Sequence, residues 1–101
     1  MKLPHAALLL GLAVLAGAAR ANDPNLGRNL AATCANCHGT NGQAIAGSGL
    51  EPLAGTDKDK LLQKLNEFKA GSRPATIMHQ IAKGYSDKQL ALIAGWFAAR
   101  K

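Results

Sequence analysis

The chain contains two cysteines, and both stand in one short segment that is completed by a histidine. Cys34 and Cys37 are separated by two residues, and His38 follows directly. This spacing has the form of a covalent attachment site for c-type haem. Each thiol can add to one haem vinyl group, and the adjacent imidazole then reaches the iron from one face. The motif therefore predicts that Cys34 and Cys37 bind haem and that His38 is the first axial ligand of its iron.

A Cys-x-x-Cys pair has two other common uses, a structural disulfide and a thiol–disulfide redox pair. A thioredoxin-like dithiol requires a βαβ context, and no neighbouring segment has a strand pattern. A simple disulfide gives no role to His38. Haem attachment is therefore the favoured interpretation.

The first residues have the features of a secretory signal. Lys2 supplies a positive start, and residues 6–19 are an unbroken run of Ala, Leu, Val and Gly. A small-x-small cleavage pattern ends at Ala21. The run is shorter than the ~20 residues of a membrane-spanning helix. We therefore expect residues 1–21 to be removed, with no stable membrane span afterwards. An uncleaved N-terminal anchor is the alternative. Residues 22–101 are then one exported domain, with a bacterial periplasm as the expected location.

The charge balance of the expected mature domain is mildly basic. Without Lys2 and Arg20 it has 10 basic and 6 acidic side chains, a net formal charge of +4 before any haem propionates. Such a surface can steer the domain toward an acidic redox partner. The alternative is a solvated surface without a partner. No basic patch interleaved with aromatic residues is present, so nucleic acid is not an expected partner.

The expected domain has about 80 residues and little material for a hydrophobic core. Its aromatic residues are Phe68, Tyr85, Trp96 and Phe97. Domains of this size often need a staple, a metal or a cofactor for stability. A haem is a large apolar body that can fill the centre, so the haem-free chain is predicted to fold poorly.

Helical patterns account for most of the expected domain, and no segment reads as a strand. Asp23 is expected to cap a first helix with Pro24 at its first position. Leu26, Leu30 and Cys34 then recur at intervals of four. Gly27, near that face, can let another helix approach closely.

Three further helices are predicted downstream. The first is capped by residues 56–59 and ended by Gly71, with four lysines expected on its solvated exterior. The second covers residues 76–83 and ends at Gly84. The third begins with a capping box at residues 86–89 and is expected to pack across the first helix of the domain. The fold class is therefore all-α, a few helices around one haem. The four lysines expected on the exterior of the helix that residues 56–59 cap are Lys58, Lys60, Lys64 and Lys69.

The segment from residue 39 to residue 49 is expected to form a loop around one haem edge, closed by Pro52 and Leu53. The Pro52 carbonyl can accept a hydrogen bond from the free ring nitrogen of His38 and fix its orientation. In the alternative interpretation Pro52 only shapes the loop. Pro52 and Leu53 are therefore predicted as part of the haem pocket.

A second axial ligand must come from the downstream region, where two neighbouring residues qualify. Met78 is the only methionine after the expected cleavage. A thioether is a soft, neutral ligand, and Met/His coordination raises the reduction potential of the iron. A lone methionine is otherwise a core-packing residue. His79 is the rival ligand.

With these residues identified, the expected mature chain resembles a class I cytochrome c over its whole length. The attachment motif lies near the start, a methionine follows about 40 residues later, and a capped terminal helix carries aromatic residues. Residues 75–86 resemble more specifically the methionine-ligand segment of the haem subunit of flavocytochrome c sulfide dehydrogenase. Residues 53–54 and 68–71 are also similar to that family, although its loop proline falls one position earlier, at Glu51.

The resemblance implies a class I cytochrome c fold, haem c on Cys34 and Cys37, and His38 and Met78 as iron ligands. It also implies an FAD-containing partner that oxidises sulfide and passes electrons to this haem. Two other functions stay open. One is a free shuttle between a dehydrogenase and a terminal oxidase or reductase. The other is a haem-based sensor or small peroxidase, which needs an open iron position.

Overall fold

The computed structural model describes residues 23–101, and its regular structure is entirely helical within that range. The all-α expectation is confirmed. The expected secretory segment, residues 1–21 with cleavage after Ala21, lies outside the described residues. No helix between residues 23 and 101 combines the length and hydropathy that crossing a bilayer requires. The elements are α2 (Leu26–Ala31), η1 (Ala32–Cys34), α3 (Ala35–His38), η2 (Thr40–Gly42), α4 (Lys58–Ala70), α5 (Met78–Lys83) and α6 (Asp87–Ala98).

The start of α2 differs from the sequence expectation. Asp23 is not the N-cap, because that position belongs to Asn25, whose side chain makes no capping bond. Instead the Asp23 carboxylate accepts a hydrogen bond from the Asn25 backbone N–H at 2.8 Å. An aspartate that bonds to the backbone two residues ahead closes a local turn. Asp23, Pro24 and Asn25 therefore form the turn that precedes the helix.

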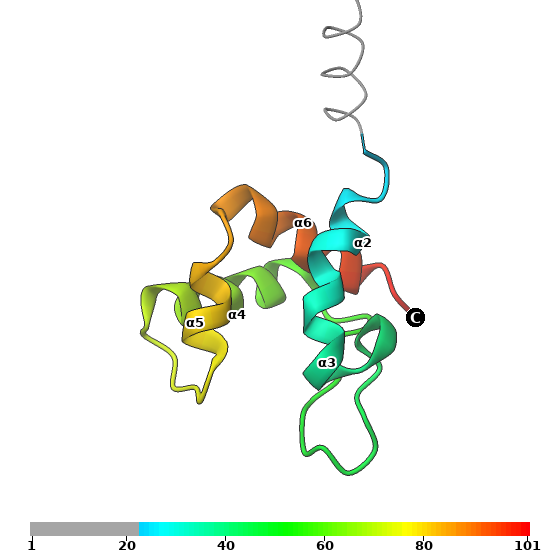
Figure 1. Ribbon diagram of the computed structural model, residues 1–101, viewed down its shortest axis with the longest axis horizontal. Coiled ribbons are helices and arrows are strands. Elements are labelled where there is room, and N and C mark those ends of the chain that lie inside the picture. Colours follow the sequence, from blue (N-terminus) through cyan, green and yellow to red (C-terminus); the bar gives the residue numbers. More distant parts are fainter. Residues whose placement is uncertain (1–22) are drawn as a thin grey trace, which may run out of the picture.

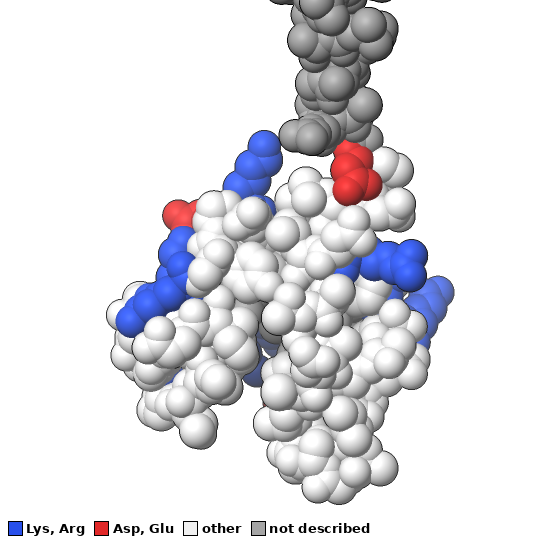
Figure 2. All heavy atoms as spheres, viewed as in Figure 1, with Lys and Arg blue, Asp and Glu red and all other residues white. Residues whose placement is uncertain are grey.

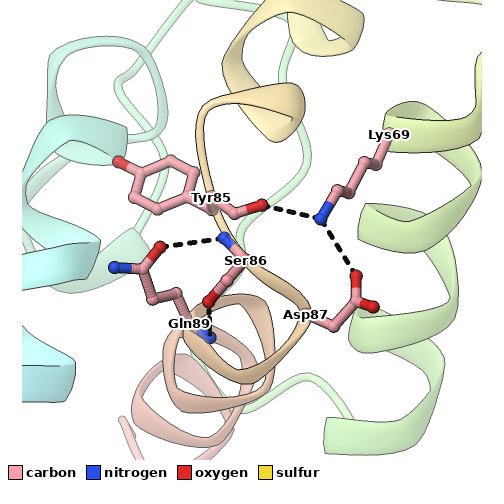
Figure 3. A network of polar contacts seen from close by, with 5 residues as sticks. All are labelled: Lys69, Tyr85, Ser86, Asp87 and Gln89. Carbon is pink, nitrogen blue, oxygen red and sulfur yellow. Dashed lines mark hydrogen bonds and ion pairs between the residues drawn. The ribbon is translucent and has the colours of Figure 1, made fainter.

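The caps of the longer helices are as predicted. Asp57 accepts a hydrogen bond from the Lys60 N–H at 3.0 Å at the start of α4, and Gly71 ends that helix in a left-handed conformation. Ser86 and Gln89 form the complete capping box of α6 (Figure 3). The short helix α5 begins at Met78, two residues later than expected, and ends at Gly84. The caps thus fix where α4 and α6 begin, and the pocket described below lies between them and α3.

The core is formed where α2 and α4 pack against α6 (Figure 1). A Cβ added to Gly27 would lie 3.4 Å from the Leu92 carbonyl oxygen and 3.6 Å from the Trp96 Cβ. This glycine therefore permits the close crossing of α2 and α6, and the predicted packing of the last helix across the first is confirmed. The buried cluster consists of Ala31, Leu61, Leu65, Leu90, Ile93, Ala94 and Phe97.

A polar network fastens the segment between α5 and α6 to two other helices (Figure 3). The Lys69 ammonium group donates to the Tyr85 carbonyl at 2.8 Å and to the Asp87 carboxylate at 3.0 Å. The Tyr85 hydroxyl donates to the Leu30 carbonyl on α2 at 3.3 Å. Lys69 is therefore a structural contact between α4 and α6, not the purely solvated residue expected from the sequence. The network holds the end of α5 in place.

Candidate functional site

A pocket of about 440 Å³ lies between the α5 side of the molecule and the α3 side. Its size falls within the range of small-molecule and cofactor sites. Figure 2 shows the hollow between these two sides, bordered in this view mainly by uncharged residues. Apolar side chains dominate the lining, and α4 and α6 supply its floor. These floor residues are Leu61, Leu65, Phe68, Ile93 and Phe97.

The three residues of the predicted attachment motif reach this pocket from η1 and α3. Cys34, Cys37 and His38 all line it, and both thiols are free. Cys34 is half-buried and Cys37 is exposed. Burial raises the pKa of the Cys34 thiol, although a backbone hydrogen bond lowers it in part. The folded chain therefore presents Cys34 to the pocket as a neutral thiol at neutral pH.

The surroundings of His38 differ from the expectation. Its Nδ1 atom is buried and has no hydrogen-bond partner among residues 23–101. The Pro52 carbonyl, the expected partner, instead accepts from the Thr56 hydroxyl at 3.4 Å. Pro52 is exposed and lies outside the pocket lining, whereas Leu53 belongs to the lining. Thr56 lies four residues after Pro52, so a local bond satisfies the carbonyl that was assigned to His38.

Gly42 fixes the position of the chain at Leu53, and the sequence did not predict this contact. Its carbonyl oxygen accepts hydrogen bonds from the backbone N–H groups of Leu53, at 2.8 Å, and Ala54, at 3.0 Å. The turn signal at residues 40–42 indicated a loop but not which distant segment it would bind. The two bonds bring the chain after the long loop back against η2, which follows α3.

The second predicted ligand enters the pocket from the other side. Met78 is the first residue of α5 and lines the pocket. His79, the rival, does not belong to the lining, and its Nε2 atom is hydrogen-bonded to the Arg73 carbonyl oxygen. The structure therefore brings Met78 together with Cys34, Cys37 and His38, and holds His79 outside.

These residues fit a haem c. Two free thiols and an imidazole lie on one wall, a thioether lies on another, and the space between is mainly apolar. Imidazole and thioether are an established pair of haem iron ligands. In the described part of the chain, Nδ1 of His38 is the one buried side-chain nitrogen or oxygen without a hydrogen-bond partner. Buried polar atoms in proteins are normally hydrogen-bonded, so this ring is unusual.

Two basic residues at the pocket were missed. Lys64 lines it and is half-buried, although it was expected on the solvated exterior of its helix. The sequence did contain an indication of this position, because Lys64 lies between Leu61 and Leu65, the two buried residues of α4. Arg73 also lines the pocket, from the loop after α4. Both can offset negative charge on a bound group.

Arg73 is paired with Glu67, and this pair predicts a pH dependence. The Arg73 Nε donates to the Glu67 carboxylate at 2.6 Å. This bond is the main cause that lowers the pKa of Glu67, followed by the bond from Gln63. A carboxyl group with a lowered folded pKa contributes stability above its unfolded pKa, near 4.5, and loses that contribution as the pH falls through the folded value.

We therefore expect Glu67→Gln to lower the free energy of unfolding modestly at neutral pH, because the pair is partly exposed and screened by salt. The difference from the parent should shrink in acid below pH 4.5, where the parent carboxyl also becomes neutral. Urea titrations at neutral and acidic pH measure this. A difference that stays constant down to strong acid would contradict the assigned ion pair.

Sequence comparisons find relatives of this chain. The sequence model of the cytochrome c family matches residues 25–97. The chain is 38% identical over 71 residues to the cytochrome subunit of sulfide dehydrogenase from Chlorobaculum tepidum, which covers 70% of this chain and 63% of that protein. It is 38% identical over 94 residues to cytochrome c4 from Pseudomonas aeruginosa, with 93% of this chain and 45% of that protein covered.

A third relative is matched over its whole length. Cytochrome c-554(548) from Halomonas halodenitrificans is 32% identical over 85 residues, which covers 80% of this chain and 100% of that protein. The match to cytochrome c4, in contrast, spans less than half of that relative, and the match to the sulfide dehydrogenase subunit spans less than two thirds of it.

Proposed function

Because the chain belongs to the cytochrome c family and is an electron carrier with one covalently bound haem c, we propose that Cys34 and Cys37 hold this haem and that His38 and Met78 are its axial ligands. The observation that carries the proposal is that one pocket receives all four side chains. When bound, haem c supplies a one-electron redox couple. The chain is not a catalyst by itself.

The chain's own residues adapt this couple to electron transfer. His38 and Met78 would both ligate the iron of a bound haem, which would leave no position open for a substrate. The apolar floor of the pocket, with Leu61, Leu65 and Phe97, excludes water from the buried face of the site. A neutral thioether ligand and a dry surrounding both favour a raised reduction potential. The structure thus supports electron carriage in preference to the sensor or peroxidase function.

Met78→Ala tests the axial ligand. The oxidised parent should show the weak sulfur-to-iron absorption band at the red edge of the spectrum, and the variant should lose it completely. The reduced variant should bind carbon monoxide readily, and the parent should resist it. The reduction potential of the variant should fall because the thioether is gone.

His79→Phe is the control for this experiment, because it alters the neighbouring residue and keeps the proposed ligand. It should retain the sulfur-to-iron band. A parent protein without that band would overturn Met78 as the ligand and leave His79 as the candidate. Ready carbon monoxide binding by the reduced parent would instead favour the sensor or peroxidase function.

For the redox partner, we propose a flavoprotein that oxidises sulfide, with this chain as its haem-bearing subunit. The similarity to a cytochrome subunit of sulfide dehydrogenase supports this choice. The alternative is a free shuttle between a dehydrogenase and a terminal oxidase or reductase, and the full-length match to a small cytochrome favours it. We also propose export to the periplasm with removal of residues 1–21.

Purification of the native protein from its source separates the two partner proposals. A subunit should elute together with an FAD-containing protein, and addition of sulfide to that complex should reduce the haem. A shuttle should elute alone, and sulfide should leave it oxidised on the same timescale. The intact mass of the purified chain gives its first residue, and the proposed cleavage requires that residue to be Asn22.

A further inference from the structure

Met78 and His79 are adjacent donors at the start of α5, and either side chain can ligate haem iron. An imidazole is a strong iron ligand, so a chain that uses the methionine must restrain the neighbouring histidine. Met78 lines the pocket and His79 does not. The contacts of His79 show what restrains it.

The His79 ring is held by a carbonyl group and by an aromatic neighbour. Its Nε2 atom lies against the Arg73 carbonyl oxygen, which can only accept a hydrogen bond. In the neutral ring Nε2 therefore carries the proton, and this nitrogen has no in-plane lone pair with which to bind iron. On α4, the Phe68 ring centroid lies 6.3 Å from that of His79, with an interplanar angle of 52°. His79 is half-buried between these groups.

The Arg73 carbonyl is in turn fixed by one residue of α4. The Arg73 side chain donates to the Glu67 carboxylate at 2.6 Å. The backbone N–H groups of Ser72 and Arg73 point to the Glu67 carbonyl, at 3.0 Å and 3.4 Å, and the Ser72 hydroxyl donates to it at 3.3 Å. The Arg73 guanidinium also lies 5.9 Å from the Phe68 ring centroid. Glu67 thus fastens the loop that carries the acceptor for His79.

We propose that the Glu67–Arg73–His79 chain of contacts, here called the histidine latch, selects Met78 as the iron ligand by holding His79 out of the pocket. Glu67, Arg73 and His79 are positioning residues in this scheme, and none of them touches the iron. The inference rests on the proposed ligand Met78. It predicts that His79 stays out of the pocket even when Met78 is removed, provided that the latch is intact.

The test compares variants with the haem attached, in the Met78→Ala background. In Met78→Ala itself the ferric spectrum should be that of iron with an open or water-filled sixth position, because His79 is retained. Adding Glu67→Ala removes the carboxylate that holds the Arg73 side chain and should convert the major species to a low-spin form with two histidine ligands. Adding His79→Phe to that pair should abolish the low-spin form, which identifies His79 as the source.

Asp59→Ala is the matched control, since it removes an exposed acid from the same helix, and no ion pair of Asp59 occurs among the described contacts. In the Met78→Ala background it should leave the sixth position open. The latch is overturned if Met78→Ala alone gives the low-spin form and His79→Phe removes it. It is also overturned if Glu67→Ala has no more effect than Asp59→Ala.

A second measurement retains Met78. On heating, Glu67→Ala should lose the sulfur-to-iron band at a lower temperature than the parent, and Glu67→Ala with His79→Phe should recover much of the difference. No recovery would mean that His79 is not the competitor. A parent without the band would contradict Met78 as ligand, which is the failure of the proposed function and is distinct from a failure of the latch.

Discussion

A variant with both Cys34 and Cys37 replaced by serine is expected to be colourless and to have no cooperative fold. Eight hydrophobic residues are buried in the described part of the chain. Four of them, Leu61, Leu65, Ile93 and Phe97, also line the pocket. Without a covalently bound haem, half of an already small core would face an open, water-accessible space. Domains of this size have little stability in reserve.

Far-ultraviolet circular dichroism and urea titration measure this effect, with absorbance reporting bound haem. The double variant should lose most of its helical signal and show no sigmoidal transition. The single variants Cys34→Ser and Cys37→Ser each keep one attachment point and serve as controls that should remain coloured in part. A colourless double variant with parental helix content and a sharp transition would show that the helices fold without the cofactor.

Gly42→Ala is expected to lower the free energy of unfolding by about 2–5 kcal/mol. Gly42 has a φ of +74°, a left-handed conformation that costs a residue with a Cβ about 1–2 kcal/mol. The added Cβ would lie 2.8 Å from the Phe97 Cδ1 and 3.0 Å from both the Ala54 nitrogen and the Leu53 Cβ. These contacts involve a backbone atom and a buried ring, so they cannot be relieved by moving a flexible side-chain end.

The matched control is Gly95→Ala in α6. The three atoms nearest to a Cβ at Gly95 all belong to the flexible side chain of Lys58, the closest at 3.6 Å. Alanine is also the better helix former, so this change should be neutral or should stabilise by up to about 1 kcal/mol. Urea unfolding of both variants gives the comparison. Equal stability of Gly42→Ala and the parent would mean that the chain near Leu53 packs less tightly than described.

Features that depend on short stretches of sequence were predictable. The capping box at Ser86 and the N-cap at Asp57 are set by hydrogen bonds over three residues, so local chemistry decides them. The small side chain at Gly27 indicated a close helix crossing, and α6 occupies that position. The spacing of Cys34, Cys37 and His38 also places all three at one pocket, because η1 and α3, which carry them, follow each other directly.

Features that depend on competition between partners were not predictable. Asp23 had two possible backbone partners, and the turn to Asn25 prevailed over a helix cap. The Pro52 carbonyl had two possible donors, and Thr56, only four residues away, prevailed over His38. For Lys64 the helical face could be predicted from its neighbours Leu61 and Leu65, but the pocket on that face could not. The latch at Glu67 joins three segments whose proximity follows only from the folded chain.

The crossing of α2 and α6 implies an order of events during biosynthesis. These helices stand at opposite ends of the described chain, and a protein emerges from its N-terminus onward. The segment with both thiols is therefore complete while α6, which supplies part of the pocket floor, has yet to be made. Ile93 and Phe97 of α6 line the same pocket as Cys34, so the thiols have their widest access before these two residues arrive. A haem attached in that interval would be in place before α6 completes the pocket.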